Sequence, residues 1–167
     1  MGESVFEKFN EMFDVNEIAN AVKEAAENSG DFEKKDVPFD DYECRITKLE
    51  IGEHTFDDEY KGMPEAHVWF RIINHPEYGG QTLFMNNRLV SLNNPKSNGF
   101  IIHKFNTFLE SLESNITPVF ENFTQYKNLV DQIFNEIDGR AEYQLHYYEA
   151  NNKGSTFKDY VIIKRFK

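Results

Sequence analysis

Residues 64–89 read PEAHVWFRIINHPEYGGQTLFMNNRL, and this stretch decides how the rest of the chain is interpreted. Apolar and polar side chains alternate along 66–73 and again along 82–88, as they do in strands that bury one face. The polar stretch HPEYGG between them is typical of a turn. The sequence therefore predicts a β-hairpin with an aliphatic inward face, formed by Ala66, Val68, Phe70, Ile72, Leu83 and Met85.

The outward face of this hairpin combines aromatic rings with cations. Trp69 and Phe84 fall on it, together with Arg71, Arg88 and asparagines. Single-stranded nucleic acid is bound by surfaces of this kind, on which bases stack against aromatic planes and cations pair with phosphates. The alternative for both rings is partial burial under the N-terminal segment, because large apolar side chains are usually buried.

A strand is also predicted at 42–51, and its apolar pattern changes phase. Tyr42, Cys44 and Ile46 share one parity, whereas Leu49 and Ile51 have the other. Such a change indicates a β-bulge, at which a strand bends and twists more strongly.

A second hairpin is predicted at the end of the chain, with strands at 141–149 and 157–166 around the turn NNKGS. In the last strand we expect Val161 and Ile163 to face inward, and Tyr160, Lys164 and Phe166 to face outward. Helical periodicity predicts two helices before this hairpin, over 101–112 and 124–138, with Gly139 ending the second.

These elements predict a mainly β fold with α-helices, of the OB-fold type. Five antiparallel strands would form a barrel, with a bent first strand and a two-helix insertion between strands 3 and 4. OB-folds bind oligonucleotides across their second and third strands and the adjoining loops. We expect this domain to span residues 37–167, after an acidic N-terminal helical segment at 1–36.

The N-terminal segment holds most of the negative charge. The net charge is −11, but residues 1–43 contain 13 of the 29 acids and only 4 of the 18 Lys and Arg residues. The remaining chain is therefore close to neutral and can still present a basic groove. Residues 3–29 are predicted to be helical in two pieces, the first with Phe6, Phe9 and Phe13 at helical spacing and the second started by Asp14.

The predicted nucleic-acid-binding residues share the outward parity of their strands and are either cationic or aromatic. They are Arg45, Lys48, Trp69, Arg71, Phe84, Arg88, Tyr148, Tyr160, Lys164 and Phe166.

Other functional classes find little support in the sequence. The five histidines show no metal-ligand spacing, and the acids at 57–59 are interpreted as a solvated loop. No catalytic or phosphate-binding motif is present. We therefore expect no metal, no cofactor and no enzyme activity. Cys44 is the single cysteine, which favours a reducing compartment such as the cytoplasm of a host cell. Neither a secretory signal nor an apolar run of membrane-spanning length is found.

The chain resembles a family of phage single-stranded DNA-binding proteins, long catalogued as a domain of unknown function in phages of low-GC Gram-positive bacteria. The resemblance is carried by VPFDDYECRITKLEIGE, VWFRIINHPEYGGQTLFMN, GFIIHKFNTFLESL, FENFTQYKNLVDQIFNEIDGRAEYQLHYYE and FKDYVII, with FDVNEIANAVKEAAENSG as an acidic lead-in. It implies an OB-fold that binds single-stranded DNA (ssDNA) in phage DNA replication or recombination.

Two functions from different classes follow. The first is sequence-tolerant ssDNA binding, with phage replication or recombination proteins and a second copy of the chain as candidate partners. The alternative is an acidic protein-interaction module or DNA mimic that inhibits a host nuclease or defence system. The net charge of −11 favours the alternative, and the concentration of that charge in residues 1–43 favours the first.

Overall fold

The structure is a computed structural model that describes residues 12, 14–28 and 35–167. The chain divides into two compact units, residues 1–36 and 37–167. In the first unit, helix α2 (Val15–Asn28) starts after Asp14, whose carboxylate accepts a hydrogen bond of 3.0 Å from the backbone N–H of Glu17. This cap confirms the predicted start of the second helical piece. The first piece, with Phe6, Phe9 and Phe13, lies outside the described residues.

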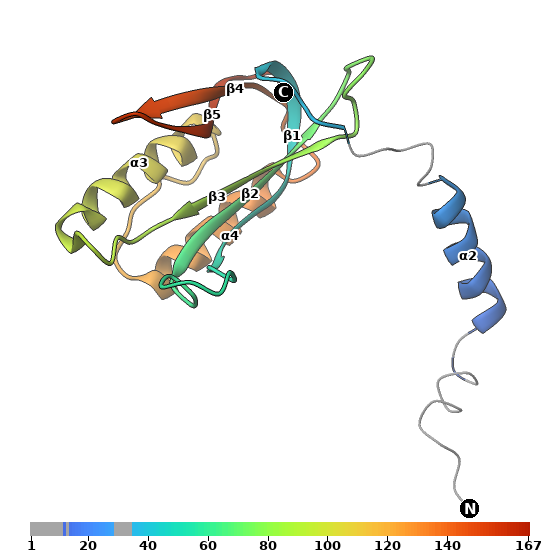
Figure 1. Ribbon diagram of the computed structural model, residues 1–167, viewed down its shortest axis with the longest axis horizontal. Helices are drawn as coiled ribbons and strands as arrows, with labels where there is room; N and C mark the ends of the chain where they lie inside the picture. The colour runs from blue at the N-terminus through green and yellow to red at the C-terminus, as the bar shows by residue number, and fades with distance from the viewer. Residues whose placement is uncertain (1–11, 13, 29–34) are drawn as a thin grey trace, which may run out of the picture. The chain divides into compact units, whose positions relative to one another are not determined.

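The second unit is built on one five-stranded antiparallel sheet (Figure 1). The strands are β1 (Asp40–Glu53), β2 (Pro64–Ile72), β3 (Thr82–Arg88), β4 (Tyr143–Asn152) and β5 (Ser155–Arg165), and their order in the sheet is β3-β2-β1-β4-β5. The mainly β class and the five antiparallel strands are therefore as predicted. The sheet is not closed, because β3 and β5 remain its two edges. A closed barrel is not confirmed.

The inward face of β1 and β2 follows the predicted pattern. The pairing of β1 with β2 shifts register between Ile46 and Lys48, which places the predicted bulge at Thr47. The bulge lets residues of both parities reach the core, and Tyr42, Cys44, Ile46, Leu49 and Ile51 are all buried.

The predicted phase of β5 is wrong. Tyr160 and Ile162 are buried, whereas Val161 and Ile163 are exposed. The cause is a second irregularity: Leu145 pairs with Ile162 but Gln144 pairs with Lys164, so Ile163 is an extra residue in β5. Tyr160 consequently belongs to the core rather than to the outward face.

The helices between β3 and β4 cover the core from the inward side of the sheet. A short 3-10 helix η1 (Pro95–Ser97) leads into α3 (Asn98–Ser111), which contacts β5, and α4 (Phe123–Ile137) contacts β1. Asn122 and Gln125 form a capping box at the start of α4, and Gly139 follows its end with φ +70°. Within the described part of the chain, no helix has the length and apolar character needed to cross a membrane.

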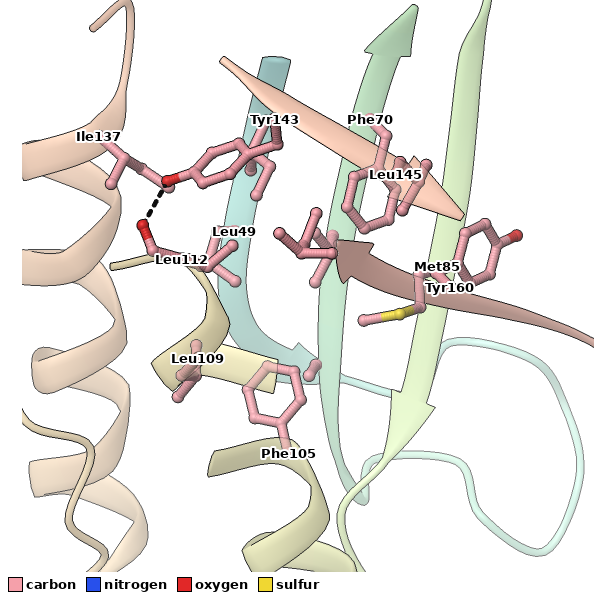
Figure 2. Close-up of a cluster of buried hydrophobic side chains, with 14 of the residues drawn as sticks. Leu49, Phe70, Met85, Phe105, Leu109, Leu112, Ile137, Tyr143, Leu145 and Tyr160 are labelled. Atoms are coloured by element: carbon pink, nitrogen blue, oxygen red, sulfur yellow. Dashed lines mark hydrogen bonds between the residues drawn. The ribbon is translucent and has the colours of Figure 1, made fainter. Parts of the chain in front are cut away.

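The core joins both halves of the sheet to the helices (Figure 2). The fully buried Tyr143 of β4 donates a hydrogen bond of 2.8 Å from its hydroxyl to the Leu112 carbonyl oxygen at the end of α3. Tyr160 stacks on Phe70 of β2 with ring centroids 5.4 Å apart, and on Tyr147 of β4 at 5.2 Å.

One hydrogen bond links the two edge strands. The Tyr160 hydroxyl of β5 donates to the Phe84 carbonyl oxygen of β3 at 2.8 Å. The edges are thus held near each other by a side chain, and the backbone that carries the outward Phe84 ring is anchored to the core.

Candidate nucleic-acid interface

The outward face of β1, β2 and β3 is arranged in rows, because residues that pair across antiparallel strands hold their side chains next to each other. Four successive rows follow from the strand pairing. Listed from one end of the face, they are Arg45–Arg71–Thr82, Lys48–Trp69–Phe84, Glu50–His67–Asn86 and Gly52–Glu65–Arg88. The first is called the arginine row and the second the aromatic row.

The aromatic row is open to solvent. The Trp69 side chain is 36% exposed and Phe84 is 45% exposed, so both rings point outward, as the alternation predicts. Their centroids lie 5.2 Å apart with ring planes at 83°, an edge-to-face pair. The Lys48 ammonium lies 4.5 Å from the Trp69 ring centroid and therefore makes a cation–π contact. The row offers two exposed aromatic rings beside one cation.

The arginine row borders the aromatic row and has one unpaired cation. Arg45 Nη2 lies 2.6 Å from Glu142 Oε1, and the hydrogen bond from Arg45 lowers the pKa of Glu142. Arg71 is exposed and has no ion-pair partner among the residues that the structure describes. Arg71 can therefore receive an anion without breaking an existing ion pair.

The other predicted residues lie away from these two rows. Arg88 is two rows from Phe84 along β3, and its guanidinium lies 4.2 Å from the Tyr60 ring. Tyr148, Lys164 and Phe166 lie on β4, on β5 and just after it, in the other half of the sheet order. Tyr148 donates a hydrogen bond to Asp159, and the Lys164 ammonium lies 5.0 Å from the Phe166 ring.

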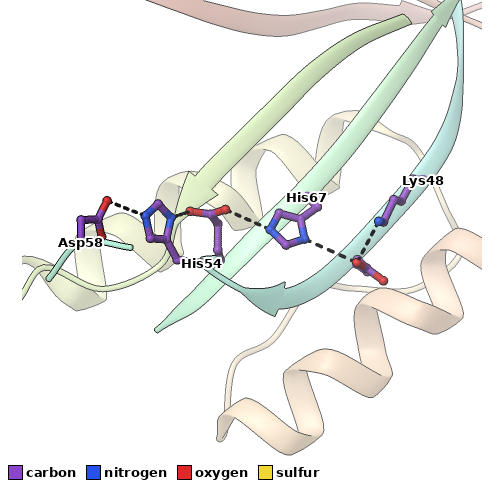
Figure 3. A network of polar contacts seen from close by, with 6 residues as sticks. Lys48, His54, Asp58 and His67 are labelled. Atoms are coloured by element: carbon purple, nitrogen blue, oxygen red, sulfur yellow. Dashed lines mark hydrogen bonds and ion pairs between the residues drawn. The ribbon is translucent and has the colours of Figure 1, made fainter. Parts of the chain in front are cut away.

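A line of six titratable side chains starts at the aromatic row and runs to the loop after β1 (Figure 3). It is called the imidazole–carboxylate chain. Lys48 Nζ lies 3.3 Å from Glu50 Oε1, which lies 3.4 Å from His67 Nδ1. The other ring nitrogen of His67 lies 2.9 Å from one oxygen of Glu65. The line continues through His54, with Nδ1 2.6 Å from the second Glu65 oxygen and Nε2 2.9 Å from Asp58 Oδ2.

The hydrogen bonds of this chain shift the pKa values of its members. Hydrogen bonds to Asp58 and Glu65 raise the pKa of His54, and the hydrogen bond from His54 lowers the pKa of Asp58. Partial burial raises the pKa of Glu50, but the hydrogen bonds from Lys48 and His67 outweigh it and the net shift is downward. The side chains lie in a line, and among the described residues no three His, Cys, Asp or Glu side chains form a group that could hold a metal ion.

The sequence analysis missed the imidazole–carboxylate chain, and it assigned Asp58 to a solvated loop. Asp58 instead bonds to His54 and, through Oδ1, accepts a hydrogen bond from the backbone N–H of Tyr60. A signal was present in the outward positions of the two strands, where Glu50 of β1 and the Glu65–His67 pair of β2 alternate with inward residues. Only the pairing of Glu50 with His67 shows that these residues touch.

Comparisons with known proteins supply no family. No protein-family model matches the chain, and no curated protein matches it. The resemblance to phage ssDNA-binding proteins therefore stays a prediction from the sequence.

Proposed function

We propose that the outward face of β1, β2 and β3 binds ssDNA with little sequence preference. The observation that carries this proposal is the aromatic row: two solvent-exposed rings paired across strands, with Lys48 on one of them. In the next row lies Arg71, which has no ion-pair partner among the residues described. Every base has a flat face, so stacking on Trp69 or Phe84 tolerates any sequence.

The exposed aromatic rings support single-stranded rather than duplex nucleic acid as the ligand. Bases in a duplex are already stacked on each other, so their faces are not available to Trp69 and Phe84. The electrostatics point the same way, because among the described residues only one of the three cations in the two rows lacks an acidic partner. A surface that relied on phosphate contacts alone would need more free cations.

The topology supports an OB-type fold as the scaffold. The strand order β3-β2-β1-β4-β5, the bulge in β1 and the helices between β3 and β4 all agree with that plan. The hydrogen bond from Tyr160 to the Phe84 carbonyl brings together the edges that a closed OB barrel would join. A role in phage DNA replication or recombination rests on the family resemblance of the sequence.

Titration with oligo-dT tests the proposal. Trp69 is the only tryptophan, so its fluorescence reports on the aromatic row directly. We expect dT to quench it and a duplex of the same length to compete poorly. The slope of log affinity against log salt should fall by roughly 0.7 when Arg71→Gln removes one phosphate contact. Arg140→Gln, which removes an exposed cation from the loop after α4, should leave the slope unchanged. Absence of dT binding even at low salt would refute the proposal.

The acidic character of the chain favours one second candidate, a DNA mimic that inhibits a host nuclease or defence protein. Thirteen acids in residues 1–43 supply the charge density that such a mimic needs. The same titration separates the candidates, because a mimic binds no dT. Deleting residues 1–36 would then abolish inhibition, whereas it would leave the ssDNA-binding face intact.

A further inference from the structure

All four imidazole–carboxylate contacts of this chain can be hydrogen bonds in only one protonation state. Each of the four ring nitrogens of His54 and His67 faces a carboxylate oxygen, at 2.6 to 3.4 Å. A neutral imidazole has one N–H donor and one acceptor nitrogen, and an ionised carboxylate only accepts. Four hydrogen bonds therefore need four protons, two more than a pair of neutral imidazoles carries.

The fully protonated chain is also the one whose charges balance. Its three carboxylates, Glu50, Glu65 and Asp58, are then matched by two imidazolium rings and the Lys48 ammonium. Without the two extra protons, two of the four contacts would set an imidazole lone pair against a carboxylate lone pair. That arrangement is unfavourable where the side chains are shielded from water, and Glu65 and His54 are only 5% and 8% exposed.

The neighbouring strands enclose the His67 imidazole. His67 on β2 faces Glu50 of β1 and, on β3, the uncharged Asn86. A Cβ atom on Gly52 would stand 3.0 Å from the His67 ring, so glycine makes room for the imidazole at this position.

His54 is enclosed by groups from the neighbouring elements. Besides Glu65 and Asp58, it contacts the Tyr60 ring, whose other neighbour is the Arg88 guanidinium of β3. Arg88 lies opposite Glu65 in the strand pairing and stabilises the charged form of Asp58. Among the described residues, these are the charged and titratable groups that face the two imidazoles.

The chain ends on the proposed binding surface. Glu50 is shared between His67 and Lys48, and Lys48 lies on the Trp69 ring. When His67 carries its second proton, it competes with Lys48 for Glu50. Lys48 is then more easily transferred to a phosphate. When His67 is neutral, Glu50 holds Lys48 alone, and the carboxylate repels the approaching phosphate more strongly.

We propose that the imidazole–carboxylate chain makes nucleic-acid binding at the aromatic row proton-dependent, with Glu50 and His67 acting as positioning residues for Lys48. The inference rests on the proposed ssDNA binding of this face. By linkage, each proton taken up on binding tightens the affinity by up to about tenfold for each unit that the pH falls. We expect the affinity to tighten as the pH falls, because a lower pH favours the doubly protonated imidazole.

The test measures the affinity for labelled oligo-dT by fluorescence anisotropy at pH 6, 7 and 8, at constant ionic strength. Wild type should bind more tightly at each lower pH. His67→Gln should lose most of this pH dependence. Glu50→Gln should bind tightly at all three pH values, because Lys48 is then free at each of them. Glu50 is partly exposed, so this variant keeps the fold even where His67→Gln is destabilised.

Two control variants separate this mechanism from a general charge effect. Glu53→Gln removes one carboxylate from the same strand outside the chain, and His103→Gln removes a histidine of α3. Both should keep the wild-type pH dependence. The inference is overturned if wild type binds dT with the same affinity at all three pH values, or if Glu50→Gln keeps the full dependence. Absence of dT binding at every pH would instead overturn the proposed function, and this inference with it.

Discussion

Replacing Trp69 by alanine tests the two faces of β2 against each other, with Val68→Ala as the matched control. The residues are neighbours on one strand, but Trp69 is 36% exposed on the outward face and Val68 is fully buried on the inward face. Under the proposed function, both changes should weaken the fold, but only Trp69→Ala should weaken ssDNA binding.

The magnitudes follow from the contacts of each side chain. Loss of one stacked base costs about 1–3 kcal/mol, which raises Kd roughly 5- to 150-fold. Trp69→Ala also removes the edge-to-face pair with Phe84, worth about 0.5–1.5 kcal/mol, and the cation–π contact with Lys48, worth about 0.5–1 kcal/mol. Val68→Ala removes two buried methylene equivalents at about 0.8 kcal/mol each, plus the cost of the cavity they leave.

Thermal melts and anisotropy titrations with labelled dT measure both quantities on the same samples. Both variants should lower Tm by several degrees, at about 4 °C for each kcal/mol in a domain of this size. Only Trp69→Ala should weaken binding at a temperature where both variants are folded. Equal Kd values for Trp69→Ala and wild type would refute the role of the indole ring as a stacking surface.

Three further predictions concern Tyr160, His54 and the N-terminal segment. Tyr160→Phe removes the hydroxyl that bonds to the Phe84 carbonyl and should cost about 1–2 kcal/mol in urea melts; an unchanged midpoint would mean that this bond does not hold the sheet edges together. His54→Asn should destabilise most below about pH 6.5 and less as the pH rises, because the pKa of His54 is raised in the folded state; a deficit that grows with pH would contradict this. If residues 1–36 assemble copies of the chain, their deletion should lower the number of chains per particle measured by sedimentation. An unchanged number of chains with tighter ssDNA binding would show instead that the acidic segment competes with phosphate.

Strands that bury one face were predictable in detail because their alternation is strict. In β2 every second residue from Ala66 to Ile72 is fully buried, and the bulge in β1 was visible because the apolar parity changes after Ile46. In β5 the apolar run Tyr160–Ile163 has suitable residues at both parities. Its phase is set by the pairing with β4, including the extra residue at Ile163, and no periodicity within β5 reveals it.

The candidate site was predictable only where it depends on parity. Trp69, Phe84, Arg71 and Lys48 could be placed on one face from alternation alone. Their grouping into rows depends on strand register, which the sequence pattern leaves open. The imidazole–carboxylate chain needs the register and also the fold of loop 54–63, which brings Asp58 back onto His54. The sequence pattern also does not determine whether the sheet closes, because closure depends on how the two edge strands approach each other.

The ion pairs of the outward face explain how an acidic chain could bind ssDNA. In the part of the chain that the structure describes, Lys48 and Arg45 are held by Glu50 and Glu142, and Arg71 is the one cation of the two rows without such a partner. Phosphates would have to displace carboxylates from the other two, and such an exchange gains little net electrostatic free energy. Most of the affinity would then come from stacking on Trp69 and Phe84. Under the proposed function, we expect such a surface to discriminate against duplex DNA, which offers phosphates but no free base faces. We also expect its affinity to depend less on salt than its number of cations suggests.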